Sequence, residues 1–517
     1  MAGIRAVLLV TAVAFVGALA GCGGGSSSSS SSSSSSEGGG GASLTGSGYP
    51  GVDAANTRHV DGQIDSSNVT SLEEAWTAPI HGASNFGSYA STPVIDEGVI
   101  YSQDLGSNVE ALDLESGEVL WAKTYEQPDE GPNGVVVAGG MVFGATPSAA
   151  FALDQKTGEE VWSTELVRTK TEGIDMAPGY QDGIVYVSTV PLNTTSRYEG
   201  GGVGILWALD AKTGKKLWEF DTVPKNLWGK PKINSGGGVW YPPAFDEKGG
   251  IYFGVGNPAP YPGTNQYFWG SSRPGPNLYT NSLVKLNAKS GKLEWYHQVT
   301  PHDLYDWDFQ GPPILIKAGG KDLVIAAGKS GIVLAADRET GKVVWQKAVG
   351  RHSGHDEDGL LAMRGEEEKI KKPDTIYPGT LGGVIAPMST DGKMVFVPIV
   401  NSPLSMSASG ATSEGGGAAR GEIVALDAAT GALKWKEELG APAYGATTSV
   451  GDVVFATSAE GAVTAFKASN GQVLWRETLP AGTNSGVMAN GDMLIAAAGL
   501  ASAAGQTPKL VAYRVSE

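Results

Sequence analysis

The chain has 517 residues and a formal net charge of −17, from 37 Lys and Arg against 54 Asp and Glu. This acidic balance argues against a nucleic-acid-binding protein, because no basic surface is left to neutralise phosphates. Hydrophobic residues make up 41% of the chain, enough for a large core, and the single Cys excludes an intrachain disulfide and a multi-cysteine metal site. The 75 Gly, 28 Pro and 13 Trp favour short strands and tight turns over a helical bundle.

Residues 1–22 have the pattern of an export signal. Arg5 precedes an apolar run from Ala6 to Ala20, which is shorter than the roughly 20 residues of a bilayer span. The run leads into Leu19-Ala20-Gly21-Cys22, which resembles a bacterial lipobox and implies a lipidated Cys22 after cleavage. The alternative is an ordinary signal peptide with an incidental Cys. We expect an exported, extracytoplasmic protein that is lipid-anchored to the cell membrane through Cys22.

Residues 23–48 are rich in Gly and Ser and include an unbroken serine run from Ser26 to Ser36. Such a segment buries nothing and behaves as a flexible tether. We therefore expect the folded part to begin near Tyr49 and residues 49–517 to form one domain.

One pattern occurs seven times in residues 49–517. An apolar strand ends at Asp, Asn or once Lys, a turn ends in Gly, and a Trp follows four residues later, as in Ala111-Leu112-Asp113 with Gly117 and Trp121. This pattern predicts a hairpin in which Gly supplies the left-handed backbone. A base period of about 40 residues, with insertions, is typical of four-stranded propeller blades. The later Gly–Trp pairs are Gly158 and Trp162, Gly214 and Trp218, Gly291 and Trp295, Gly341 and Trp345, Gly431 and Trp435, and Gly471 and Trp475.

An eighth copy is divided between the two ends of the chain. Leu510 to Tyr513 is typical of the third strand of a blade, and Leu72 to Trp76 supplies the missing fourth strand. Closing the ring with both termini would remove exposed strand edges. We therefore predict an all-β protein, an eight-bladed β-propeller whose last blade is closed by the N- and C-terminal strands. We expect the repeat tryptophans to pack blade against blade and not to bind a cofactor.

With this repeat, the chain resembles the PQQ-dependent (quinoprotein) alcohol and glucose dehydrogenases, which are eight-bladed propellers with Trp-containing PQQ-type repeats. The opening Tyr49 to Arg58, then Asn68-Val69 and Ala75-Trp76, also looks like that family's N-terminal approach. Non-catalytic scaffold lipoproteins that resemble the outer-membrane assembly factor BamB share the Trp repeat. The function must therefore come from the insertions between strands.

The segment Pro301 to Asp308, which reads Pro-His-Asp-Leu-Tyr-Asp-Trp-Asp, matches that family's catalytic-strand motif without a gap. The resemblance implies that Asp306 is the general base, which takes the substrate's hydroxyl proton as hydride leaves for the cofactor. On an extended segment Asp306 and Asp308 point to one face, and paired carboxylates suit a hard cation. The resemblance implies Ca²⁺ or a lanthanide and does not decide between them. A solvated acidic loop is the alternative, and the role of His302 stays open.

Two residues are assigned to the cofactor by resemblance. Trp240, in the stretch Gly236 to Trp240, corresponds to the floor under the planar quinone of PQQ. Lys329, between Gly328 and Ser330, corresponds to the cation that contacts the quinone oxygens. Core packing for Trp240 and an ordinary turn for Lys329 are the alternatives.

Two further metal ligands are implied in the same way. Asn257, followed by Pro258, resembles the family's metal-ligand loop, and Glu199 matches the metal-binding Glu by its spacing before Asp210. The ordinary alternatives are an Asn-Pro turn and a surface-loop Glu.

The chain also departs from the family pattern. The adjacent cysteines of the alcohol enzymes are absent, and no Lys or Arg occurs between Lys123 and Lys156, where an Arg is expected. Ala90 replaces an acidic contact, and Ile385-Ala386 replaces an Asn-Trp pair. The residues that match the floor, the general base and the metal ligands are therefore retained, whereas several residues that would cover the cofactor from above are absent.

Two function classes follow. The first is a dehydrogenase that oxidises a small-molecule alcohol or sugar and passes electrons to a separate membrane quinone or cytochrome, since the chain has no Cys-x-x-Cys-His haem motif. The second is a non-catalytic, BamB-like scaffold that binds protein or cell-envelope partners. The segment Pro301 to Asp308 favours the dehydrogenase. A hydrolase with paired carboxylates near Asp306 is a weaker third idea.

Overall fold

The computed structural model describes residues 48–192, 197–414, 419–501 and 505–516. The chain divides into two units, Met1–Ser43 and Leu44–Glu517, and all the described residues belong to the second unit. Cys22 and the Gly/Ser segment up to residue 47 lie outside the described residues, so the export signal, lipid anchor and tether remain predictions. Among the described residues, no helix has the length and apolar character of a membrane span.

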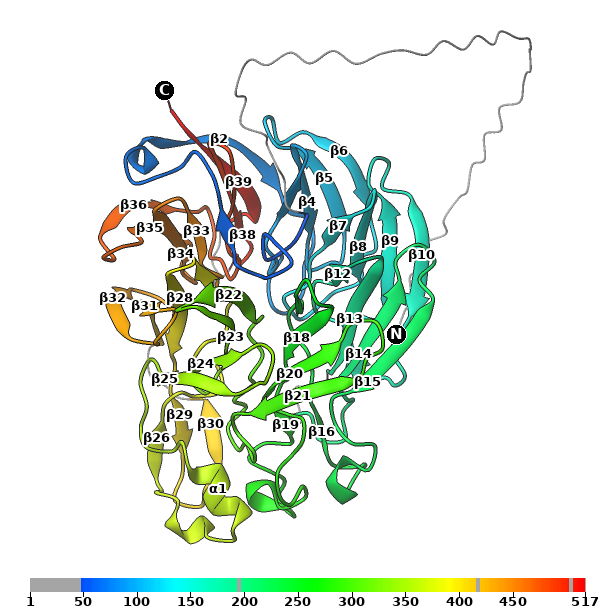
Figure 1. The fold of residues 1–517 in the computed structure, drawn as a ribbon, viewed down its shortest axis with the longest axis vertical. Coiled ribbons are helices and arrows are strands. Elements are labelled where there is room, and N and C mark those ends of the chain that lie inside the picture. The colour runs from blue at the N-terminus through cyan, green and yellow to red at the C-terminus, as the bar shows by residue number, and fades with distance from the viewer. Residues whose placement is uncertain (1–47, 193–196, 415–418, 502–504, 517) are drawn as a thin grey trace, which may run out of the picture. The chain divides into compact units, whose positions relative to one another are not determined.

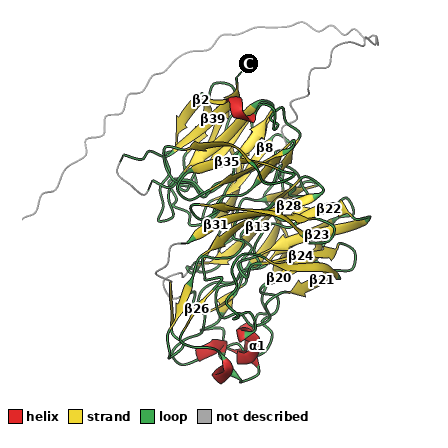
Figure 2. Cartoon of the chain, turned by 90° about the vertical axis from the view of Figure 1, so that its left-hand side faces the viewer, coloured by secondary structure: helices red, strands yellow, loops and turns green. Residues whose placement is uncertain are grey.

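The described residues form eight sheets that share one plan, in which four antiparallel strands follow one another (Figures 1 and 2). This confirms the all-β prediction. The first four sheets are β3 (Val94–Asp96), β4 (Val99–Gln103), β5 (Val109–Asp113) and β6 (Val119–Lys123); β7 (Val136–Ala138), β8 (Met141–Ala145), β9 (Ala149–Asp154) and β10 (Glu160–Glu165); β12 (Gly179–Gln181), β13 (Ile184–Pro191), β14 (Ile205–Asp210) and β15 (Lys216–Asp221), with β11 (Glu172–Gly173) on β13; and β17 (Ala244–Phe245), β18 (Gly250–Gly254), β20 (Ser282–Asn287) and β21 (Leu293–Gln298).

The remaining sheets continue in chain order, and the last one joins both ends of the chain. There β2 pairs antiparallel with β39, as the split repeat predicts (Figure 1). These sheets are β22 (Ile314–Ala318), β23 (Lys321–Ala327), β24 (Ile332–Asp337) and β25 (Val343–Ala348); β27 (Ser389–Thr390), β28 (Met394–Asn401), β31 (Arg420–Asp427) and β32 (Leu433–Leu439); β33 (Thr448–Val450), β34 (Val453–Thr457), β35 (Ala462–Lys467) and β36 (Val473–Thr478), with β1 (His59–Val60) parallel to β33; and β37 (Met488–Asn490), β38 (Met493–Ala498), β39 (Lys509–Val515) and β2 (Leu72–Pro79).

Insertions between the strands carry the remaining short elements. The helix α1 lies at the end of the molecule that also holds β26 (Figure 2). These elements are β16 (Ser235–Gly236) with β19 (Pro258–Ala259); β26 (Asp374–Ile376), β29 (Leu404–Met406) and β30 (Thr412–Glu414); α1 (Asp358–Met363); and the short turns η1 (Val69–Ser71), η3 (Leu227–Gly229), η4 (Phe268–Gly270) and η5 (Glu367–Lys369).

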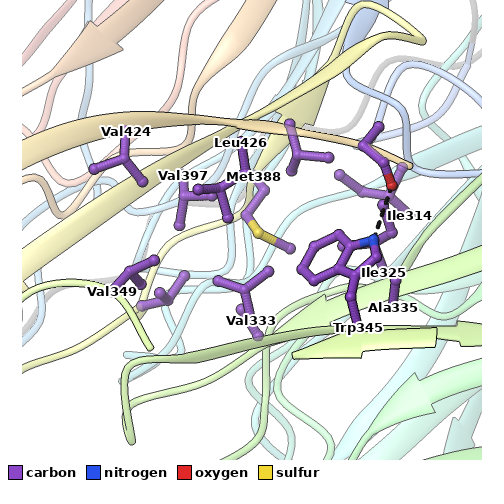
Figure 3. Close-up of a cluster of buried hydrophobic side chains, with 14 of the residues drawn as sticks. Ile314, Ile325, Val333, Ala335, Trp345, Val349, Met388, Val397, Val424 and Leu426 are labelled. Carbon is purple, nitrogen blue, oxygen red and sulfur yellow. Dashed lines mark hydrogen bonds between the residues drawn. The ribbon is translucent and has the colours of Figure 1, made fainter. Parts of the chain in front are cut away.

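Neighbouring sheets pack through buried apolar side chains. One such cluster joins β22–β25 to β28 and β31, and Trp345 lies within it beside Ile325 and Ala335 (Figure 3). The Trp345 indole N–H donates a hydrogen bond to the carbonyl of Ala428 on the next sheet, at 3.0 Å. The ring therefore buries a large apolar surface while its polar atom keeps a partner.

Trp345 represents a contact that recurs around the described sheets. In seven places a Trp indole donates to the carbonyl one residue after the repeat Asp, Asn or Lys of the next sheet, at 2.7–3.2 Å. The same ring lies over the repeat Gly of that sheet, where a Cβ would collide with it. This confirms the expected packing role. The donor–Gly pairs are Trp76 with Gly117, Trp121 with Gly158, Trp162 with Gly214, Trp218 with Gly291, Trp295 with Gly341, Trp345 with Gly431 and Trp435 with Gly471.

Gly291 tests this contact, because it has a φ of +66° and an added Cβ would lie 2.7 Å from the Trp218 ring. Gly183 has a φ of +80° but nothing within 4 Å of an added Cβ, so it isolates the backbone strain. We expect Gly183→Ala to lower the free energy of unfolding by about 1 kcal/mol and Gly291→Ala by roughly 2–4 kcal/mol. Urea unfolding curves measure both, and equal losses would mean that the ring contact adds nothing.

Candidate functional site

A cavity of about 360 Å³ lies where the first strands of the sheets begin. Each of the eight sheets contributes at least one lining residue from the segment just before its first strand. Trp240, Asp308 and Lys329 line this cavity, so three predicted site residues meet there. The contributions in sheet order are Ala90, Glu130, Asp175, Trp240, Asp308, Ile385, Tyr444 and Asn484.

An ion triplet forms one wall of the cavity. The Lys329 Nζ lies 2.9 Å from Asp306 Oδ2 and 2.6 Å from Asp308 Oδ2, and all three side chains are at most 12% exposed. Burial raises the pKa of the Asp306 carboxyl well above its usual range, against the opposing effect of Lys329. Burial alone would lower the pKa of Lys329, but the two carboxylates raise it above its usual value. The positive charge that the paired carboxylates require is thus supplied within the chain.

The loop that carries Asp306 is held in an uncommon conformation. Asp306 has a φ of +65°, a region that non-glycine residues seldom adopt. The Asp303 carboxylate accepts hydrogen bonds from the backbone amides of Tyr305 at 2.8 Å and Trp307 at 2.7 Å. These bonds restrain the loop on both sides of Asp306. Arg273, which is fully buried, donates to the Asp303 carbonyl. The loop therefore holds the base in place before any ligand arrives.

A second set of buried polar groups fixes the same loop from the insertion around α1. The Tyr305 hydroxyl donates to Asp358 Oδ2 at 2.5 Å. His355 Nδ1 lies 2.6 Å from the same oxygen, and its Nε2 lies 3.2 Å from Asp374 Oδ2. Burial lowers the pKa of His355, but the two carboxylates outweigh it and raise the pKa above its usual value. Only the folded structure brings these residues together, and no motif in the sequence marks them.

Asn257 and Trp240 approach the ion triplet from another sheet. The backbone N–H of Asn257 donates a hydrogen bond to Asp308 Oδ1 at 2.7 Å. A Cβ on Gly256 would lie 2.5 Å from Asp308 Oδ1 and 2.8 Å from Trp240 Nε1, so this close approach requires glycine. The structure thus brings the predicted residues Trp240, Asn257, Asp306, Asp308 and Lys329 together.

Glu199, a predicted metal ligand, and His302, whose role was left open, do not line the cavity. Glu199 is exposed and does not line the cavity, although its neighbour Tyr198 does. His302 is buried, with its ring nitrogens each 3.1 Å from a carbonyl oxygen, those of Gly275 and Trp269. Burial lowers the pKa of His302 to about 4. His302 therefore contacts two surrounding loops and does not line the cavity.

The opposite side of the cavity is acidic, which the sequence interpretation missed. Glu130 and Asp175 line it, and Asp129 is buried next to Glu130. Burial raises the pKa of Asp129 to about 7, despite hydrogen bonds from the Gly131 and Glu130 amides. Burial, then Asp129 and Glu130, raise the pKa of Asp175 well above its usual range. The available signal was the stretch without Lys or Arg between Lys123 and Lys156.

A hard metal ion needs oxygen ligands, and a planar quinone needs a flat aromatic surface. Asp306 Oδ1 is a buried acceptor without a partner among the described residues, as a metal ligand or general base would be before its partner binds. Trp240 lines the cavity and its indole N–H has no partner either. Within the described residues, no three His, Cys, Asp or Glu side chains converge as a complete metal-binding group. Of the predicted ligands, Asp306 Oδ1 is the oxygen without a partner among the described residues, whereas both oxygens of Asp308 already accept from Lys329 and from the Asn257 backbone.

Comparisons with known proteins relate the chain to redox propellers. Residues 173–351 match the family described as glucose/ethanol/alcohol dehydrogenase, beta-propeller domain. Residues 31–164, 105–235 and 412–517 match the family described as outer membrane protein assembly factor BamB. Both families consist of the repeat that the sequence predicts.

Individual relatives agree with this assignment. The chain is 31% identical over 360 residues to quinohemoprotein alcohol dehydrogenase ADH IIB of Pseudomonas putida, covering 62% of this chain and 50% of the relative. It is 29% identical over 402 residues to a quinohemoprotein alcohol dehydrogenase of Comamonas testosteroni, covering 69% and 54%. The chain thus spans about half the length of these relatives.

Solved structures show the same fold. The quinohemoprotein alcohol dehydrogenase of Comamonas testosteroni superposes with a TM-score of 0.78 at 25% identity, covering 91% of this chain and 80% of that one. A europium-containing methanol dehydrogenase gives 0.76 at 19% identity, covering 92% and 98%. BamB from Moraxella catarrhalis gives 0.51 at 14% identity, covering 86% and 97%. The last two show the fold alone.

The ion triplet makes a prediction about stability. Lys329→Met leaves two buried carboxylates without their cation, and we expect a loss of about 3–5 kcal/mol in the free energy of unfolding near neutral pH. The variant removes the neighbour that lowers the pKa of Asp306, so its folded state binds more protons than the unfolded chain and its stability falls as pH rises. Denaturant unfolding at several pH values measures this.

Lys225→Met is the matched control, because Lys225 is exposed and lies 3.8 Å from Asp221. An exposed pair of this kind contributes little, so we expect a change below about 1 kcal/mol. A Lys329→Met variant as stable as the control would contradict the importance of the triplet.

Proposed function

Because the chain belongs to the PQQ-repeat β-propeller family of the quinoprotein alcohol dehydrogenases, we propose that it oxidises a small-molecule alcohol or sugar with PQQ and a bound Ca²⁺ or lanthanide. One observation carries this proposal: Trp240, Asp308 and Lys329, from three separate segments, line one cavity, and Lys329 also pairs with the buried Asp306. A scaffold propeller needs no buried base and cation there.

The residues present would hold both groups. Trp240 offers a flat aromatic surface to the quinone ring, and Lys329 offers a cation to its oxygens. Asp306, Asp308 and Asn257 offer oxygen donors to the metal, while the exposed Glu199 would have to turn inward to join them. When bound, PQQ supplies the electron acceptor and the metal supplies Lewis acidity.

The chain itself supplies the proton chemistry. The unpartnered Asp306 Oδ1 is the atom that would take the hydroxyl proton of the substrate. Burial raises the pKa of Asp306, which makes its carboxylate a stronger base, while Lys329 opposes that rise and orients the other oxygen by donating a hydrogen bond to it. The hydrogen bonds from the Tyr305 and Trp307 amides to Asp303 restrain the loop and so orient Asp306 Oδ1.

We further propose an extracytoplasmic protein that is lipid-anchored through Cys22. A membrane quinone or a cytochrome would then accept the electrons. The alternative function is a BamB-like scaffold for protein or cell-envelope partners. The family match over residues 31–235 and 412–517 favours it, and it requires no cofactor.

Titration of PQQ into the purified protein, with Ca²⁺ or with La³⁺, tests the proposal through tryptophan fluorescence and thermal stability. We expect saturable, metal-dependent binding, followed by a screen of alcohols and sugars. Asp306→Asn should reduce turnover by at least about 10³-fold with PQQ still bound, because it removes the base. Trp240→Ala should weaken PQQ binding itself.

Glu159→Gln, at an exposed turn, should change neither binding nor turnover. Absence of PQQ binding with both metals would overturn the proposal and favour the scaffold. Binding without turnover on any alcohol or sugar would overturn the substrate class.

A further inference from the structure

The acidic side of the cavity carries unpartnered oxygens. Asp175 is 1% exposed and lines the cavity, and its Oδ1 has no hydrogen-bond partner among the described residues. Asp129 is 2% exposed, and its Oδ2 likewise has none. The two lie on either side of Gly131, whose amide donates to Asp129 Oδ1 and whose added Cβ would lie 2.5 Å from the Asp175 carboxyl carbon.

No positive charge is available to these carboxyls. Among the described residues that line the cavity, Lys329 is the one cation, and both Asp306 and Asp308 already hold it. Arg58 is buried nearby but donates to the carbonyls of Thr447 and Pro50 and to the Thr448 hydroxyl. Two buried carboxyls without a cation favour retaining a proton, and the free pair loses it as the pH rises through their pKa.

The acidic side of the cavity would repel a tricarboxylate ligand if its own carboxyls were ionised. PQQ carries carboxylates that stay ionised near neutral pH. Ionised Asp175 and Glu130 would repel them, whereas a carboxylic acid donates its O–H to a carboxylate in a short, charge-assisted hydrogen bond. The charged and titratable groups around Asp175 are Asp129, Glu130 and Asp308, together with the hydroxyls of Tyr198 and Tyr241.

We propose that Asp175 binds the cavity's ligand as a neutral carboxylic acid that donates its O–H to a ligand carboxylate, so that the tricarboxylate PQQ enters with the uptake of a proton. This inference rests on the proposed function and adds a proton-coupled binding step to it. No bond other than hydrogen bonds forms, and the proton comes from solvent. Asp129 provides the negative neighbour that keeps the proton on the pair.

The affinity for PQQ at saturating Ca²⁺, measured at about pH 6, 7 and 8, tests the inference. For each proton taken up, Kd should rise by up to about tenfold per pH unit above the pKa of the free pair. Calorimetry in buffers of different ionisation enthalpy should detect the proton uptake directly. PQQ itself does not change the charge of its carboxylates in this range.

Asp175→Asn keeps the shape and supplies an N–H donor without a proton to bind. We expect its Kd to stay within about threefold of the wild-type value at the lowest pH and to lose the pH slope. Asp129→Asn should reduce the slope as well, because it removes the neighbour that retains the proton. Glu159→Gln, an exposed carboxylate elsewhere, should keep the wild-type slope.

The possible results separate the two proposals. Binding with no pH dependence and no proton uptake, or an unchanged slope in Asp175→Asn, would overturn the inference and leave the dehydrogenase intact. Absence of binding to every variant at every pH would overturn the proposed function and this inference with it. Loss of binding in Asp175→Asn alone, with an unchanged melting temperature, would show that the carboxyl acts as an anion and would also overturn the inference.

Discussion

The contact between seven tryptophans and the repeat glycine of the next sheet links the described sheets to one another. An indole is flat, and it can lie on a turn only where that turn has no side chain, which is why Gly and Trp recur together. The hydrogen bond from the indole N–H to the neighbouring carbonyl sets the rotation of one sheet against the next. Because the first strands of all eight sheets then begin around one cavity, a residue just before each strand becomes part of one site.

Such a frame can stabilise features that cost free energy locally. Asp306 adopts a positive φ, and three charged groups are buried beside it, each at a cost that the loop alone could not offset. Asp303 holds the loop from within, and Tyr305 ties it to Asp358 in the insertion around α1. The rigid sheets and the polar clamps together keep the Asp306 carboxylate fixed, as a general base requires.

The sequence predicts the features that local pattern determines. The repeat glycines and tryptophans predicted the strand order, and the closure by β2 and β39 followed from the incomplete copies at the two ends. The segment from Pro301 to Asp308 and the positions of Trp240, Asn257 and Lys329 also marked residues that the structure brings together. The strand order was predicted correctly because it depends on residues close in sequence, while the roles of the marked site residues stay predictions.

Other features depend on contacts across the fold, which no spacing reveals. Asp129 and Asp175 belong to different sheets, and only folding places both beside Gly131. The position of His355 between Asp358 and Asp374 likewise depends on the fold. Lys329 was expected to contact the quinone oxygens, which stays a prediction, and the structure places its ammonium between Asp306 and Asp308.

The two sides of the cavity solve the same electrostatic problem in different ways. A low-dielectric site cannot hold several carboxylates unless something offsets their charge. On one side the ammonium of Lys329 does so, while Asp306 Oδ1 has no partner among the described residues. On the other side Asp175 and Asp129 have no cation, so protons must offset their charge. A ligand that is anionic toward Asp175 and metal-bound toward Asp306 therefore matches this cavity only when the proton and the metal both accompany it.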